Sequence, residues 1–195
     1  MAVDTRIYDN RFFKNTKKLE SASAKETAEI ILNNFYSKSI IDIGCGAGIY
    51  LKEFEKRGIE VLGVDGSPAA MEESEIKNKI VLHDLCKPFN LKRKFDLCLC
   101  FEVAEHLPPS CSETLIQTLI NLSDKIVFTA ATPGQGPASI GHINEQSHIF
   151  WIKMFRQRNF RYERKLSYEI RNSLAKKDVV WWIVKNLMVF ANEKQ

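Results

Sequence analysis

The stretch "SIIDIGCGAGIYLKEF", residues 39–54, joins an apolar run, a turn that contains three glycines and an amphipathic segment. Glycine inside a helix or strand lowers stability by roughly 0.5–1 kcal/mol relative to alanine, so a cluster of glycines indicates a turn that needs them for another reason. Glycine lets the backbone approach a ligand closely. The stretch therefore predicts a strand, a ligand-binding turn and a helix, in this order.

Similar apolar runs recur along the chain, and most of them are continuous rather than alternating. Continuous runs are typical of strands that are covered on both faces of a parallel sheet. They span residues 40–43, 61–64, 80–82, 95–101 and 126–130. Helical patterns occupy residues 14–36, 49–56 and 112–122, and a short one starts at residue 68, whereas residues 86–94 are expected to form a loop. This alternation predicts an open α/β sheet.

The pattern changes after the fifth run. A glycine-rich loop at residues 132–141 precedes a predicted helix at residues 148–157. Residues 161–170 and 186–191 are then expected to close the sheet as an antiparallel hairpin.

Composition and charge set the class of protein. The chain has 195 residues, 45% hydrophobic and 27% charged, which is ordinary for one globular domain. The net charge of +4 permits a nucleic-acid partner but does not argue for one. The longest apolar run, residues 179–190, is too short to span a bilayer, and the N-terminal residues lack the apolar stretch of a signal peptide. We expect a soluble cytoplasmic protein.

Cysteine usage supports the same expectation. The five cysteines include no C-x-x-C pair. Cys98 and Cys100 alternate within an apolar run, which favours one buried strand face. We therefore expect reduced core thiols rather than disulfides.

The glycine turn distinguishes between two kinds of cofactor. A dinucleotide fingerprint requires G-x-G-x-x-G, but Ile49 stands where the last glycine is needed. The spacing here is G-x-G-x-G, and Asp42 precedes it. An acidic residue is poorly suited to a diphosphate and well suited to the ammonium and sulfonium groups of S-adenosylmethionine.

Two more carboxylates end predicted strands. Asp65 ends the second strand, where a carboxylate can accept hydrogen bonds from ribose hydroxyls. Asp84 follows the third strand and is placed to meet an adenine amino group. Three acidic strand ends beside one glycine turn make S-adenosylmethionine the predicted cofactor.

At these residues the sequence resembles the class I S-adenosylmethionine-dependent methyltransferases, in particular the type 11/12 and ubiquinone-pathway O-methyltransferase group. The segments IDIGCGAG, VLGVDGS, VLHDL and FDLCLCFEVAEHL carry the resemblance, which is specific over about residues 38–131. The resemblance implies a Rossmann-like, seven-stranded, mostly parallel sheet with helices on both faces and an antiparallel last strand. It also implies that the cofactor is lined by Asp42, Gly44, Cys45, Gly46, Asp65, Gly66, Asp84, Leu85 and Phe101.

We accordingly expect one methyltransferase domain over residues 1–195. Residues 1–37 would form a helical extension, residues 38–131 the cofactor-binding core, and residues 132–195 the acceptor-side loop, helix and C-terminal hairpin.

Two histidines are candidates for chemistry. Methyl transfer requires in-line placement of the acceptor more than a catalytic group. A hydroxyl acceptor must also lose its proton, and histidine is the most common base. His106 follows the fourth strand and His142 lies after the fifth, so both should border the cleft. A structural role for either histidine stays open, and we favour His142 because its glycine-rich loop can close over an acceptor.

A divalent metal is a further possibility. Glu102, Glu105 and His106 would share one face of a helical turn, and similar E-x-x-E-H segments bind metal in some related O-methyltransferases. Many relatives carry the segment without metal, and spacing identifies no fourth ligand. We therefore assign no metal ligand.

The expected function is transfer of a methyl group from S-adenosylmethionine to an oxygen of a small molecule or carbohydrate. An RNA 2′-O-methyltransferase is the first alternative, because the E-x-x-E-H segment is accompanied by a basic, aromatic-rich tail at residues 155–171. The chain shows no added RNA-binding module, and a solvated helix face explains the basic residues equally. A non-catalytic S-adenosylmethionine-binding protein is the second alternative. The sequence identifies neither the acceptor nor the oligomeric state.

Overall fold

The computed structural model describes residues 5–135 and 141–193. Part of the expected glycine-rich loop, residues 136–140, lies outside the described residues. Within them, the strands are β1 (Ser39–Ile43), β2 (Glu60–Asp65), β3 (Ile80–Leu82), β4 (Leu97–Phe101), β5 (Lys125–Thr129), β6 (Phe160–Tyr162) and β7 (Met188–Asn192). The helices are α1 (Asn10–Asn34), α2 (Ile49–Glu55), α3 (Pro68–Glu72), α4 (Ser112–Leu122), α5 (His148–Arg156), α6 (Arg164–Leu174) and α7 (Trp181–Asn186). Short 3-10 turns lie at Thr5–Ile7, Lys77–Lys79, Ala104–His106 and Pro109–Cys111.

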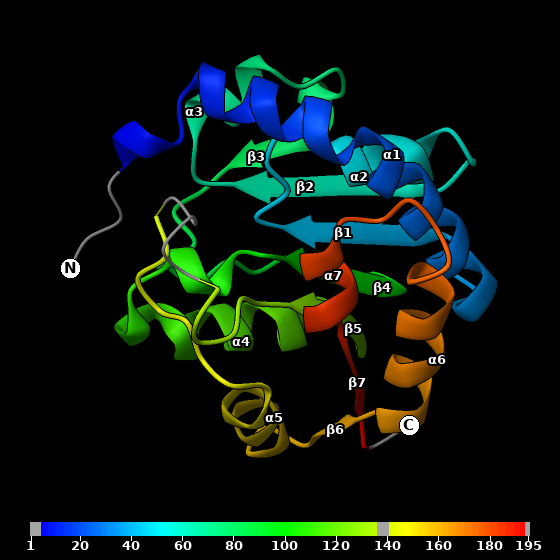
Figure 1. Cartoon of the computed structure of the whole chain (residues 1–195). Coiled ribbons are helices and arrows are strands. Elements are labelled where there is room, and N and C mark those ends of the chain that lie inside the picture. The colour runs from blue at the N-terminus through cyan, green and yellow to red at the C-terminus, as the bar shows by residue number, and fades with distance from the viewer. Residues whose placement is uncertain (1–4, 136–140, 194–195) are drawn as a thin grey trace.

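The strands form one seven-stranded sheet in the order β3-β2-β1-β4-β5-β7-β6 (Figure 1). β1 pairs in parallel with β2 on one side and with β4 on the other. β7 is antiparallel to both β5 and β6. The expected mostly parallel sheet with an antiparallel last strand is therefore confirmed.

Two apolar cores cover the two faces of this sheet, as expected from continuous rather than alternating strand patterns. On one face α4 and α5 pack with side chains such as Leu119 and Trp151, both fully buried. On the other face α1, α2 and α6 contribute Ile31, Phe54 and Ile170. Since β4 is buried along its whole length, the helices on both faces hold it at the centre of the molecule.

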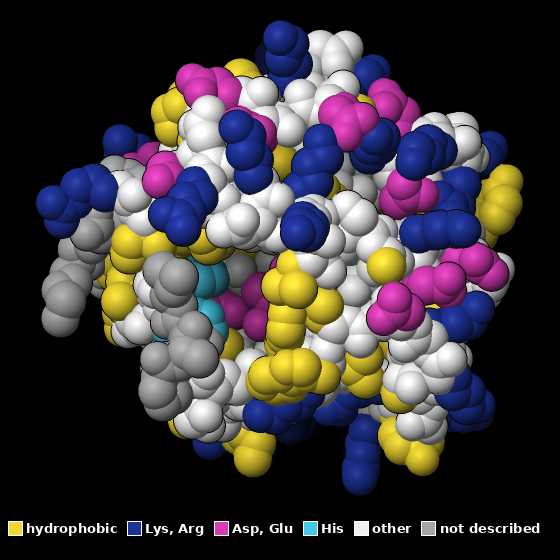
Figure 2. Space-filling view, turned by 45° about the horizontal axis from the view of Figure 1, so that its top comes forward, with side chains coloured by type: hydrophobic (Ala, Val, Ile, Leu, Met, Phe, Trp, Pro, Cys, Tyr) yellow, Lys and Arg dark blue, Asp and Glu magenta, His cyan; other side chains and the backbone are white. Residues whose placement is uncertain are grey.

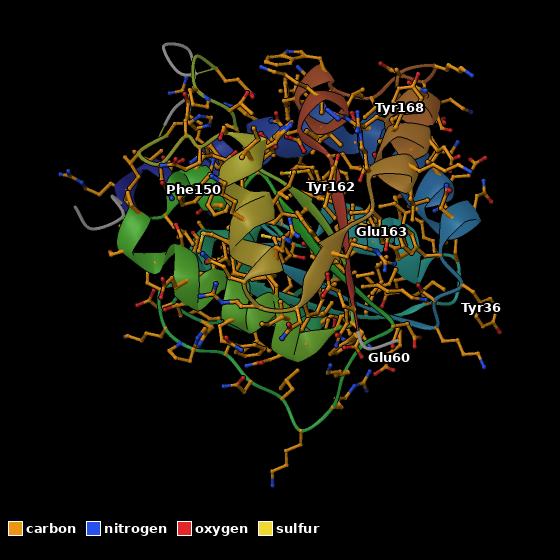
Figure 3. All side chains as sticks on the ribbon, turned by 90° about the horizontal axis from the view of Figure 1, so that it is seen from below. Tyr36, Glu60, Phe150, Tyr162, Glu163 and Tyr168 are labelled. Atoms are coloured by element: carbon orange, nitrogen blue, oxygen red, sulfur yellow. A yellow bond between two sulfur atoms is a disulfide. The ribbon has the colours of Figure 1, made fainter. Side chains whose placement is uncertain are left out.

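The C-terminal part differs from the expected hairpin. In the segment 161–170, where the first strand of the hairpin was expected, only the end of the three-residue strand β6 is extended. The helix α6 begins two residues after β6 (Figure 3). Leu166, Ile170 and Leu174 are spaced by four residues, so they form one helical stripe, and the last two are fully buried. β6 and β7 do pair with each other, but α6 and α7 lie between them in the chain.

Within the described residues, no helix combines the length and the apolar character needed to cross a bilayer.

Candidate active site

A cavity of about 1240 Å³ lies beyond the carboxyl ends of β1, β2 and β4. Because β1 pairs with β2 on one side and β4 on the other, this is where the strand order reverses, the usual ligand position in open α/β sheets. Figure 2 shows a hollow that exposes histidine and acidic side chains beside a hydrophobic border. All nine predicted cofactor residues line the cavity: Asp42, Gly44, Cys45, Gly46, Asp65, Gly66, Asp84, Leu85 and Phe101.

The turn after β1 requires glycine for two separate reasons. Gly44, Gly46 and Gly48 all have positive φ, at 80°, 53° and 71°, where residues with a Cβ are strained. At Gly44 a Cβ would also lie 2.3 Å from Cγ2 of Val103, closer than any real contact. The N–H of Gly44 donates to the carbonyl of Val64 at 2.7 Å, which ties the turn to the end of β2.

Asp42 presents an incompletely bonded carboxylate to the cavity. It is only 2% exposed, and its Oδ1 has no hydrogen-bond partner among the described residues. Burial, with a smaller contribution from the charge of Asp65, raises the pKa of Asp42 to about 7. An unpartnered buried acceptor is costly, so a donor or a cation at this place would stabilise it.

Asp65 connects the glycine turn to the start of α3. Its Oδ2 accepts from the N–H of Gly46 and its Oδ1 from the N–H of Ser67, both at 2.8 Å. Burial raises the pKa of Asp65 despite these hydrogen bonds. Each carboxylate oxygen has a second lone pair, so Asp65 can still accept from a ligand.

Asp84 lies at the more open end of the cavity, with its side chain 53% exposed. Its Oδ1 accepts from the N–H of Cys86 at 3.0 Å, and its Oδ2 lies 3.4 Å from Nζ of Lys87. The carboxylate is therefore held at the start of the loop that follows β3.

The expectation that all cysteines are reduced is wrong for one pair. Cys86 and Cys111 form a disulfide with a Cα–Cα distance of 4.9 Å, and both line the cavity. The fold brings the loop after β3 against the turn before α4, a contact that the sequence separation of 25 residues does not reveal. Cys45, Cys98 and Cys100 are free and buried, as expected.

The N-terminal segment and α7 complete the cavity, and sequence reasoning missed both. Glu20 of α1 accepts from the hydroxyl of Tyr50 at 2.9 Å. Burial is the main cause that raises the pKa of Glu20 to about 7. Trp181 and Trp182 of α7 also line the cavity, and the side chain of Trp182 interacts with that of Glu20. In the sequence, two adjacent tryptophans at positions 181 and 182 could have indicated a ligand-binding surface. In the structure Trp181 is indeed 57% exposed.

Glu102 has an unusual backbone at the end of β4. Its φ is +52°, a region that non-glycine residues rarely adopt. The amide of Asn186 donates to both of its carboxylate oxygens, at 3.1 and 3.3 Å. Strain of this kind persists where the surrounding structure fixes it, and it is common at functional sites.

His106 and His142 meet because the loop after β5 is bonded to the turn after β4. Ile143 and Asn144 donate their N–H groups to the carbonyl of Glu105, at 2.8 and 3.0 Å. The two imidazole rings then lie edge to face, with their centroids 4.8 Å apart. Both histidines line the cavity, as the sequence predicted.

The two histidines have different partners. Nδ1 of His106 lies 2.9 Å from the hydroxyl of Tyr8, whereas Nδ1 of His142 lies 2.8 Å from a carboxylate oxygen of Glu145. Burial and the nearby charge of His142 lower the pKa of His106 to about 4. His106 is therefore neutral at physiological pH and a weak base.

Glu105, His106 and His142 could hold a metal ion, since their ligand atoms lie within 4.8 Å of one another. This group differs from the set considered from the sequence, because His142 takes the place of Glu102. Glu105 is fully buried, and burial together with the charge of Glu102 raises its pKa well above the usual range.

Comparisons with known proteins agree with this geometry. A family model described as a methyltransferase domain matches residues 15–175. The ubiquinone biosynthesis O-methyltransferase of Acinetobacter baylyi is 28% identical over 104 residues, which cover 47% of this chain and 43% of that protein. The mitochondrial enzyme of the same name from Schizosaccharomyces pombe is 33% identical over 84 residues, covering 38% and 31%. The chain thus aligns with less than half the length of these relatives.

Solved structures share the fold at low identity. DesVI of Streptomyces venezuelae superposes with a TM-score of 0.69 at 12% identity, covering 92% of this chain and 96% of that one. Magnesium protoporphyrin IX methyltransferase of Synechocystis, crystallised with SAM, gives 0.59 at 19% identity, covering 77% and 74%. The chain belongs to the methyltransferase-domain family, and it has the fold of class I S-adenosylmethionine-dependent methyltransferases.

Proposed function

We propose that this chain transfers the methyl group of S-adenosylmethionine to an oxygen atom of a small molecule, with carbohydrates among the candidate acceptors. The observation that carries the proposal is the pair of adjacent histidines in the lining of the same cavity as the glycine turn and Asp42. The similarity to ubiquinone biosynthesis O-methyltransferases supports oxygen as the acceptor atom.

The cofactor would lie along the strand ends. Asp65 would accept hydrogen bonds from the ribose hydroxyls, and the glycine turn would pass beneath them. The unpartnered oxygen of Asp42 would face the cationic methionine part. Asp84 and Leu85 would border the adenine, while Phe101 would flank the methionine side. These assignments extend to this chain what the resemblance implies.

The reaction is an in-line displacement. The acceptor oxygen would form a bond to the methyl carbon while the carbon–sulfur bond breaks. The electron pair of the broken carbon–sulfur bond would stay on sulfur, which gives S-adenosylhomocysteine. His142 would take the hydroxyl proton, because the Glu145 carboxylate orients its ring and stabilises the imidazolium that forms. His106 is less suited, since its pKa is lowered to about 4.

A second route for proton removal is favoured by the cluster of Glu105, His106 and His142. A divalent ion held there would lower the pKa of a bound hydroxyl group. In each histidine one ring nitrogen already meets an outer partner, Tyr8 or Glu145, as is common around metal ligands.

Calorimetry and a transfer assay test the proposal. We expect S-adenosylmethionine and S-adenosylhomocysteine to bind and NAD not to bind. Metabolite extracts incubated with methyl-labelled cofactor should yield a labelled small molecule. Tighter binding of NAD than of S-adenosylhomocysteine would refute the cofactor assignment. Activity that is lost in EDTA and restored by Mg²⁺ or Mn²⁺ would favour the metal route, and chelator-insensitive activity would favour His142 alone.

A further inference from the structure

The walls of the cavity carry a strong excess of acidic groups. Its carboxylates come from α1, from three strand ends and from the segment after β4: Glu20, Asp42, Asp65, Asp84 and Glu102. Lys17 is the one lysine or arginine that the described residues contribute to the lining. The ammonium group of Lys17 is already paired with Glu75. Asp84 is paired with Lys87, which lies outside the lining, so within the described lining Glu20, Asp42, Asp65 and Glu102 are left without a lysine or arginine partner.

The two histidines do not reverse this balance. Nδ1 of His106 lies 2.9 Å from the uncharged hydroxyl of Tyr8. His142 faces the carboxylate of Glu145 at 2.8 Å, so a proton on its ring is balanced locally.

The basic tail does not supply the missing cations. Arg158 donates to the carbonyl of Met154, Arg161 pairs with Glu163, and Arg171 donates to carbonyls at the end of α7. None of these three arginines belongs to the cavity lining. The tail is therefore not part of a phosphate site that opens into the cavity.

Aromatic rings form much of the remaining wall. Tyr50 and Phe101 contact each other edge to face with centroids 5.2 Å apart, and Trp182 lies nearby on α7. Aromatic faces attract cations and offer an anion no favourable contact. An anionic group of an acceptor placed against these acidic and aromatic walls would lose its hydration without gaining a lysine or arginine partner from the described lining.

We propose that the methyl acceptor occupies this cavity as an uncharged or cationic molecule, and that phosphate- and carboxylate-bearing acceptors are excluded. This inference rests on the proposed function, since it assumes that an acceptor enters here. It excludes sugar phosphates, nucleotide-linked sugars and RNA as acceptors.

Quenching of tryptophan fluorescence tests the cavity charge independently of activity. In a Trp181→Phe protein saturated with S-adenosylhomocysteine, Trp182 reports from the cavity, because Trp151 is fully buried in the core. We expect iodide to quench at least about threefold less, relative to neutral acrylamide, than it quenches free N-acetyltryptophanamide. Glu20→Gln should restore part of the iodide quenching, whereas Glu113→Gln on the exposed side of α4 should not.

A ratio equal to that of free N-acetyltryptophanamide would overturn the inference. Trp181→Tyr replaces Trp181→Phe if the latter does not fold, because Trp181 is 57% exposed beside Lys185 and would dominate quenching of the unmodified chain. The transfer assay adds a second arm. Labelled products separated on an anion exchanger at neutral pH should appear in the unbound fraction. A labelled product retained through a phosphate or carboxylate would refute the inference. Absence of any labelled product would count against the proposed function, and the quenching ratio would still decide the charge.

Discussion

Replacing Asp42 by asparagine should have opposite effects on stability and on cofactor binding. The pKa of Asp42 is about 7 in the folded protein and 3.8 for an ordinary aspartate. Between these values the folded chain binds more protons than the unfolded chain, so the free energy of unfolding falls as pH rises. The loss amounts to at most about 4 kcal/mol, from about three units at 1.36 kcal/mol each. Asp42→Asn removes this loss, so its stability relative to wild type should increase as the pH rises from about 4 to about 7 and should then level off.

Cofactor binding should change in the other direction. The cationic groups of S-adenosylmethionine favour the ionised carboxylate, which is the minor form below the pKa. The dissociation constant of the wild type should therefore be about tenfold larger at about pH 6 than at about pH 8. In Asp42→Asn this dependence should disappear. Binding at about pH 8 should weaken by about 1.5–3 kcal/mol, the usual worth of hydrogen bonds to a charged group.

Glu20 lines the same cavity and also has a pKa of about 7, so wild type and Asp42→Asn are compared in a Glu20→Gln background. Cys45, Cys98 and Tyr50 stay neutral in this range, because burial raises the pKa of each well above its ordinary value. Calorimetric titration and chemical denaturation across the pH range supply both readouts, with Asp178→Asn as the exposed control. Cofactor affinity that is independent of pH in the wild type, or an unchanged slope in Asp42→Asn, would refute the reasoning.

Three further outcomes are expected. Gly44→Ala should lower the free energy of unfolding far more than Gly58→Ala. Both glycines have φ near +80°, which costs an alanine about 1–2 kcal/mol, but of the two only Gly44 lacks room for a Cβ. Equal losses of stability in denaturant would contradict this. Replacing Cys86 and Cys111 by serine should lower the free energy of unfolding by about 3 kcal/mol, because the disulfide closes a loop with a sequence separation of 25 residues. Thiol titration of the denatured but unreduced wild type should detect only the three free cysteines. His142→Gln should lower turnover by about 10²–10⁴-fold with little change in the affinity for S-adenosylhomocysteine, and near-normal turnover would leave positioning alone as the catalytic device.

The parallel half of the fold was predictable because its signals are local. The run before Gly44 is apolar without alternation, which is sufficient to predict a strand covered on both faces. Residues 80–82 and 112–122 were predicted with the bounds that β3 and α4 have in the structure. Acids at strand ends could likewise be assigned to one crevice, because parallel strands end at the same edge of a sheet.

The remaining features depend on contacts between distant parts of the chain. The Cys86–Cys111 disulfide and the approach of His142 to Glu105 join segments that only the folded sheet brings together. The wall formed by Glu20 and Trp182 depends on how α1 and α7 pack, and neither helix has a motif that identifies it as part of a site. The segment after β6 was misassigned because its stripe, spaced by four residues, lies among many polar residues.

Two departures from ordinary packing lie in the cavity lining, at Glu102 and Asp42, and a third lies next to the lining residue His106. Glu102 has a left-handed backbone, Asp42 has a buried oxygen without a partner, and Glu105 is fully buried. Each departure costs stability, and none is offset by a nearby cation among the described residues that line the cavity. A cationic cofactor would offset part of this cost when it binds. The binding energy of S-adenosylmethionine should therefore appear partly as stabilisation of the fold. At the same free ligand concentration, S-adenosylmethionine should raise Tm more than S-adenosylhomocysteine, which lacks the sulfonium charge.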